Sequence, residues 1–96
     1  MKQIDILILE LLDLRLKKFK SIQKQNYTRA AIYRDKEKEI SRKIYQLLPD
    51  PNETWNWNLF EEKLDRYCQK NFGVSYTVND SYKQLRREIK IRNLGI

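Results

Sequence analysis

The sequence predicts an all-α fold, in which a long antiparallel helical hairpin is followed by two shorter C-terminal helices packed against it. No glycine occurs before Gly73, and the only prolines are Pro49 and Pro51. Glycine and proline are the residues that weaken helix interiors most. Apolar residues also recur at helical spacing through the first 48 positions. Long helices are therefore expected before the two prolines and shorter ones after them.

The first helix is expected from about residue 2 to residue 24. It carries two apolar stripes that point in different directions: Leu9, Leu12, Leu16 and Phe19, and Ile4, Leu7, Leu11 and Leu14. A helix with two apolar stripes is buried on two sides. The start of this helix is thus predicted to lie between the second helix and either the C-terminal helices or a second subunit. The lysine-rich remainder is predicted to be buried on one side.

The second helix is expected from about Tyr27 to Leu48, with Asn26 as its N-cap and Pro49 ending it. Its apolar seam has the 3-4 spacing of coiled coils, with one charged interruption: Ala30, Tyr33, Glu37, Ile40, Ile44 and Leu47. A short turn at 24–26 makes the two helices antiparallel. In that arrangement Glu37 falls near Arg15, and we interpret this pair as a device that sets the register of the hairpin.

The C-terminal half is predicted to hold a connector and two short helices. Residues 49–57 are turn-rich, and Trp55 and Trp57 within them are expected to close the core. The third helix is expected to start with Asn58 as its cap, to end at Gly73 and to point Phe60, Leu64, Tyr67 and Cys68 inward. A linker at 74–78 leads to a final helix with Asn79 or Ser81 as its cap and Tyr82, Leu85 and Ile89 on one face. Residues 1–48 would thus form the hairpin, and residues 58–96 a helical pair completing one small domain.

Composition argues against several kinds of function. The chain has one cysteine, Cys68, and no histidine, so it lacks the usual ligands of a zinc site and the commonest general base. No glycine-rich phosphate loop or nucleophile elbow is present. Acidic residues interrupt the apolar N-terminus, which argues against a signal peptide or membrane span. We therefore expect a cytoplasmic protein that is not an enzyme, with no cofactor, no metal site and no membrane partner.

The net charge of +7 favours polyanions or acidic protein surfaces as partners. Residues 15–45 hold eleven lysines and arginines against three acids. A candidate basic face on the first helix comprises Arg15, Lys17, Lys18, Lys20 and Lys24. Nucleic-acid binding by this face is the alternative function, although no aromatic residues are interleaved with it as a stacking platform. A solvated helix face explains the same charges.

The stretch "QNYTRAAIYRDKEKEI", residues 25–40, resembles the UVR motif. That motif occurs in the B and C subunits of bacterial excinuclease, in some Clp ATPases and in activator proteins that work with them. Tyr27 stands at the aromatic position of the motif, Ala30 and Ala31 at the paired small positions, and Arg34 and Asp35 at the Arg-Asp pair. The later apolar position is held by Ile40, and the resemblance extends over about residues 11–48.

The resemblance implies a helical hairpin used for protein–protein association, as an adaptor or subunit of a repair or Clp-type assembly. Its candidate contact residues are Tyr27, Ala30, Ala31, Arg34 and Asp35. Each also has a purely structural interpretation: the alanines can pack inside the hairpin, Tyr27 can close the turn, and Asp35 can pair with a nearby lysine. The expected partner is the helical surface of another protein, or a second copy of the chain in a homodimer, with nucleic acid less favoured.

Overall fold

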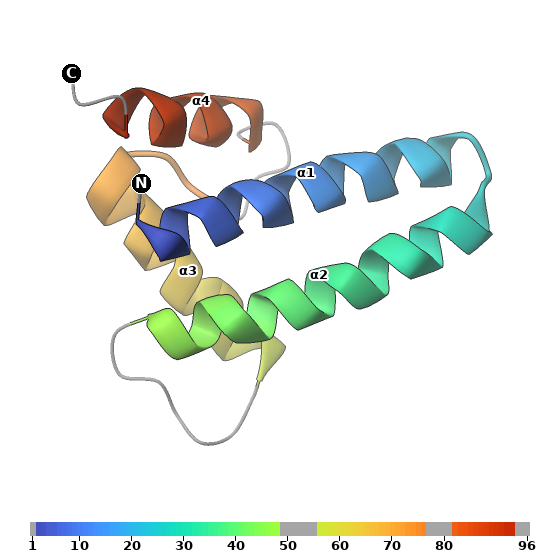
Figure 1. Ribbon diagram of the computed structural model, residues 1–96, viewed down its shortest axis with the longest axis horizontal. Helices are drawn as coiled ribbons and strands as arrows, with labels where there is room; N and C mark the ends of the chain where they lie inside the picture. Colours follow the sequence, from blue (N-terminus) through green and yellow to red (C-terminus); the bar gives the residue numbers. More distant parts are fainter. Residues whose placement is uncertain (1, 49–55, 77–81, 94–96) are drawn as a thin grey trace.

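The computed structural model describes residues 2–48, 56–76 and 82–93, and these residues form four helices and no strand. The helices are α1 (Gln3–Gln23), α2 (Tyr27–Leu47), α3 (Trp57–Phe72) and α4 (Tyr82–Arg92). α1 and α2 form a long antiparallel hairpin, and α3 and α4 lie at the end of the hairpin away from its turn (Figure 1). The predicted all-α hairpin with two shorter C-terminal helices is confirmed.

The turn between α1 and α2 follows the sequence prediction closely. Gln25 has a positive φ of 58°, a left-handed conformation that reverses the chain within three residues. Asn26 caps α2, because its side-chain oxygen accepts a hydrogen bond from the backbone N–H of Arg29 at 3.3 Å. At the other end of α2, Leu48 is extended with ψ 152°, as expected for the residue before Pro49.

The start of α3 differs from the prediction. Asn56 rather than Asn58 is the N-cap, and its side-chain oxygen accepts hydrogen bonds from the backbone N–H groups of Asn58 and Leu59. The helix therefore begins at Trp57, inside the segment that was expected to be a connector. Its end is as predicted, because Gly73 lies in the left-handed region with φ 69°, which a side chain would strain.

The core lies between α3, α4 and the part of the hairpin that they cover. We call this part the base (residues 3–15 and 37–48) and the remainder of the hairpin the tip (residues 16–36). Ile8, Leu11 and Leu12 of α1 are fully buried, which confirms that the first half of this helix is covered on two sides. α4 runs antiparallel to α1, since Tyr82 lies beside Arg15 and Asn93 beside Asp5. The second cover thus comes from the C-terminal helices of the same chain.

Several packing details differ from the sequence prediction. Leu47 is 44% exposed, and the buried positions near the end of α2 are Ser41, Ile44, Tyr45 and Leu48. The buried strip is rotated because α3 covers that side of α2, in addition to the side that faces α1. Phe19 is 52% exposed because it lies beyond the reach of α4.

The segments around α3 also differ from their predicted roles. Trp57 was expected to close the core, but it is 38% exposed and meets the ring of Phe60 edge-on. The sequence predicts a linker after α3, yet Val74 and Tyr76 are buried in the core. Trp55 and the two candidate caps of the last helix lie outside the described residues.

Candidate functional site

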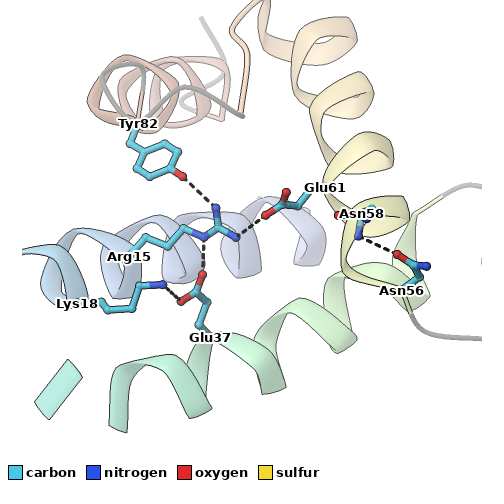
Figure 2. Close-up of polar contacts among 7 residues, drawn as sticks. All are labelled: Arg15, Lys18, Glu37, Asn56, Asn58, Glu61 and Tyr82. Atoms are coloured by element: carbon cyan, nitrogen blue, oxygen red, sulfur yellow. Dashed lines mark hydrogen bonds and ion pairs between the residues drawn. The ribbon is translucent and has the colours of Figure 1, made fainter. Parts of the chain in front are cut away.

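A polar network marks the junction between base and tip, and Figure 2 shows its residues. The Arg15 Nε lies 2.7 Å from Glu37 Oε1, and the Lys18 Nζ donates to Glu37 Oε2 at 2.6 Å. The guanidinium of Arg15 also donates to the Tyr82 hydroxyl at 2.9 Å and lies 3.7 Å from a carboxylate oxygen of Glu61. The predicted Arg15–Glu37 pair is confirmed. It belongs to a larger network that joins all four helices.

The network compensates for the burial of the Arg15 guanidinium, whose side chain is only 11% exposed. Burial acts to lower the pKa of the guanidinium, but the interactions with Tyr76, Tyr82 and Glu37 outweigh burial, so the pKa lies above its ordinary value. The guanidinium carbon also lies 4.6 Å from the centre of the Tyr76 ring, within cation–π range. A permanent charge with partners on three other helices fixes how the hairpin sits on α3 and α4.

The five candidate contact residues taken from the motif all lie in the tip. Tyr27 is 66% exposed, so the ring does not close the turn by burial. Arg34 and Asp35 are exposed, and Ala30 and Ala31 are half-buried. Among the lysines near Asp35 across the hairpin, Lys18 pairs with Glu37. These residues therefore present polar groups, one aromatic ring and two small side chains on the tip.

Ala30 and Arg34 continue a strip of α2 that is covered farther along the helix. Positions 30, 34, 37 and 41 follow the 4-3-4 spacing of one helix face. Glu37 and Ser41 are buried on this strip, whereas Arg34 is exposed. The strip thus passes from covered to uncovered at the boundary between base and tip.

The five candidate basic residues do not form one uniform face. Lys17, Lys20 and Lys24 are exposed; the first two lie one turn apart on α1, and Lys24 is the C-cap of this helix. Lys18 lies on another side and pairs with Glu37, while the guanidinium of Arg15 is turned into the junction network. Three exposed lysines, rather than five cations, are therefore presented together.

Sequence reasoning did not identify the apolar surface of the tip. Phe19, Ile22 and Ile32 are each about half exposed, although they are large and apolar. A groove of about 640 Å³ also opens beside Phe19. Its walls come from all four helices: Arg15, Leu16, Lys18, Phe19, Lys20 and Gln23 of α1, Glu37 of α2, Glu61 of α3, and Tyr82 and Lys83 of α4. The available signal was the stripe Leu12–Leu16–Phe19, which continues beyond the residues that a short fourth helix can cover.

The described residues offer no group of acids and cysteine that could hold a metal ion. Cys68 is fully buried, and burial raises the pKa of its thiol to about 12, so the thiolate required for nucleophilic chemistry is scarce at neutral pH. Among the described helices, none has the length and apolar character needed to cross a bilayer. The surface features of the tip are thus the main candidates for function.

Comparison with known protein families gives a match within the hairpin. Residues 9–43 match the family model described as the UvrB/uvrC motif. The match confirms the resemblance found in the sequence and covers the whole tip with the adjoining turns of the base. No curated protein and no solved structure gives a significant match to the chain. The matched segment spans little more than a third of the chain and stops before α3.

Proposed function

We propose that this chain is a protein–protein interaction module that docks through the tip of its hairpin. The observation that carries the proposal is the coincidence of the motif with uncovered apolar surface. Among the described residues, eight large apolar side chains are exposed, and four of them lie between positions 19 and 32. These four are Phe19, Ile22, Tyr27 and Ile32. Apolar surface concentrated in so short a segment is typical of an interaction site.

The chemistry of the tip supports docking by a helix. An alanine side chain ends at its β-carbon, so Ala30 and Ala31 allow a second helix to come close to the backbone of α2. Arg34 and Asp35 stand beside them and are exposed. Flanking charges of both signs favour one register and disfavour other partners. The contact would thus gain affinity from the apolar side chains and selectivity from the charges.

The finer assignment follows from the motif. An adaptor or subunit of a repair or Clp-type assembly is the role that the resemblance favours, with the helical surface of another protein as partner. A cytoplasmic location is part of the proposal and is supported by the single unpaired Cys68. A homodimer would use the same surface, and light scattering of the purified chain distinguishes it from association with another protein.

The test compares two variants that add the same charge to α2. Ala31→Glu places a carboxylate on the proposed contact surface, whereas Gln46→Glu places one on an exposed position of the base. We expect Ala31→Glu to lose the association that the wild type shows in quantitative affinity capture, while Gln46→Glu retains it. Both variants should keep the helical circular dichroism of the wild type. Equal recovery of the same partners by a folded Ala31→Glu variant would rule out this surface.

The alternative function is nucleic-acid binding by the exposed Lys17, Lys20 and Lys24. Three phosphate contacts would make the logarithm of the affinity for duplex DNA fall with the logarithm of salt concentration, with a slope of about −2.7. Binding to duplex and single-stranded DNA at two salt concentrations tests it. Absence of binding at low salt removes this alternative.

A further inference from the structure

The groove beside Phe19 is the place where the cover of α1 stops. Leu12 is fully buried beneath the C-terminal helices, Leu16 is partly buried, and Phe19, one turn farther along the same stripe, is 52% exposed. α4 begins at Tyr82, which contacts Arg15, so the layer that α4 forms over α1 ends at this level. The tip projects past α3 and α4, as Figure 1 shows. The apolar stripe of α1 therefore extends past the start of α4, and the groove lies where this extension begins.

The charges of the groove have one sign once internal pairing is taken into account. Glu37 is engaged by Arg15 and Lys18, and Glu61 lies near the Arg15 guanidinium. Lys20 and Lys83 stand on the walls formed by α1 and α4. Neither of these two lysines has an ion pair with an acid among residues 2–48, 56–76 and 82–93. An occupant therefore meets the apolar side chains of Leu16 and Phe19 together with two available cations.

The net charge of the whole tip also favours an acidic occupant of the groove. Residues 16–36 contain seven lysines and arginines and one acid, Asp35. The remaining 75 residues contain thirteen basic and twelve acidic residues. Almost all of the net charge of +7 is thus located in the tip, and a second tip placed against it would be repelled. Like charges brought together across an interface oppose association, whereas an acidic surface is attracted.

From this combination we infer that the groove binds an acidic amphipathic helix of another protein. The helix would place an apolar residue against Phe19 and Leu16, and carboxylates toward Lys20 and Lys83. It would cover α1 in the tip in the same way that α4 covers α1 in the base. This inference rests on the proposed function, because it names the chemistry of the partner, but it concerns a groove wall that the motif residues Ala30 and Ala31 do not form.

The probe is a synthetic 18-residue helical peptide with leucines at 3-4 spacing and glutamates on both flanks. A second peptide carries lysine at each glutamate position. Each is titrated into the ¹⁵N-labelled full chain, with backbone amide shifts recorded by NMR. We expect the acidic peptide to shift the amides of residues 16–20 and 82–83, and to bind at least tenfold more tightly than the basic peptide. Equal binding of both peptides, or shifts spread over unrelated parts of the chain, would overturn the inference.

Two matched pairs of variants locate the contact. Phe19→Ser should weaken binding of the acidic peptide at least tenfold, whereas Ile6→Ser, which removes another half-exposed apolar residue of α1, should leave it within twofold. Lys83→Glu should weaken binding severalfold, and Lys70→Glu, the same change on an exposed position of α3, should not. Equal effects within either pair would overturn the assignment to this groove.

Other occupants give distinguishable results. Shifts of residues 16–20 that depend on the concentration of the chain alone would identify a second copy, and tighter binding of duplex DNA at the same residues would identify nucleic acid. Either result overturns the inference. The experiments can show that the groove proposal is wrong while the proposed function is right. If Phe19→Ser has no effect on partner capture while Ala31→Glu abolishes it, the interaction module stands and the acidic-helix groove does not.

Discussion

The base and the tip of the hairpin are built from the same two helices but have opposite relations to their surroundings. In the base, both faces of α1 are covered, and Ile8, Leu11 and Leu12 are inaccessible to solvent. The tip projects past α3 and α4 (Figure 1), and its side chains Phe19 and Tyr27 are more than half exposed. The charge differs as well, since the tip carries seven of the basic residues and one acid.

The difference indicates that the two parts of the hairpin have different roles. Burial of apolar surface is the main source of folding free energy, so the base and the C-terminal helices supply most of the stability. The tip contributes less burial and keeps its apolar side chains available. The junction network of Arg15 and Glu37 lies where the two regions meet, and it holds the tip at a fixed orientation on the covered part. Substitutions that separate stability from association should therefore divide along this boundary.

The largest expected effect comes from one stripe of α1 that crosses the boundary. Leu12→Ala removes a fully buried side chain in the base, which should lower the free energy of unfolding by about 4 kcal/mol. Phe19→Ala removes a larger but half-exposed side chain two turns away and should lower it by less than about 1 kcal/mol. Urea denaturation followed by circular dichroism measures both. Similar losses in the two variants would contradict the contrast between base and tip.

The junction network should give the next largest effect. Glu37→Leu leaves Arg15 and Lys18 without their shared carboxylate, and removing one partner of a buried ion pair costs about 3 kcal/mol. The matched control is Glu39→Leu, because Glu39 pairs with Lys43 at an exposed site, where an ion pair contributes about 0–1 kcal/mol. Thermal unfolding and light scattering report stability and oligomeric state. If Glu37→Leu changes neither, the pair does not set the register.

Features that depend on residues close in sequence were predictable. The 24–26 turn, the Asn26 cap, the end of α2 before Pro49 and the Gly73 end of α3 each follow from a local conformational preference. The Arg15–Glu37 pair was predictable too, because an antiparallel hairpin with a known turn has only one register.

Features that depend on the placement of α3 and α4 were not predictable. Leu48 rather than Leu47 is buried because α3 lies against that side of α2. Tyr76 enters the core because the chain after α3 returns along Arg15, a contact that no local pattern encodes. In the same way, the motif resemblance located the tip and Tyr27, but not the groove beside Phe19. The stripe through Leu12, Leu16 and Phe19 shows that these residues share one face of α1, but whether Phe19 is covered depends on where α4 begins.

The response to alkaline pH should originate in α3 and the segment that follows it, which pack on the base and not on the tip. Burial raises the pKa of the Cys68 thiol to about 12, from 9.0 for a free thiol. The folded protein therefore retains a proton that the unfolded chain loses above pH 9, so stability declines as pH rises from 9 toward 12. At pH 10 the loss from this group is about 1 kcal/mol. Burial likewise raises the pKa of Tyr67 and Tyr76, which extends the decline at higher pH.

Denaturation at pH 8, 9 and 10 measures this decline. Cys68→Ala should be less stable than the wild type at pH 8 because it opens a cavity, but its stability should fall less steeply from pH 9 to pH 10. Phe19→Ala, a change in the tip, should retain the wild-type dependence. If the stability of Cys68→Ala falls between pH 9 and pH 10 as steeply as that of the wild type, the decline comes from other groups.

The smallest expected effect compares two asparagine caps, Asn26 in the tip and Asn56 at the start of α3. Asn56 accepts hydrogen bonds from two backbone N–H groups at the start of α3, at 2.9 and 3.3 Å, whereas Asn26 accepts one at 3.3 Å at the start of α2. Asn56→Ala should lower the free energy of unfolding by about 1 kcal/mol, and Asn26→Ala by about 0.5 kcal/mol. Because the tip packs against less of the molecule, Asn26→Ala should also speed hydrogen exchange in residues 29–33 without changing exchange in the base. Faster exchange throughout α1 and α3 after Asn26→Ala would mean that tip and base unfold as one cooperative unit.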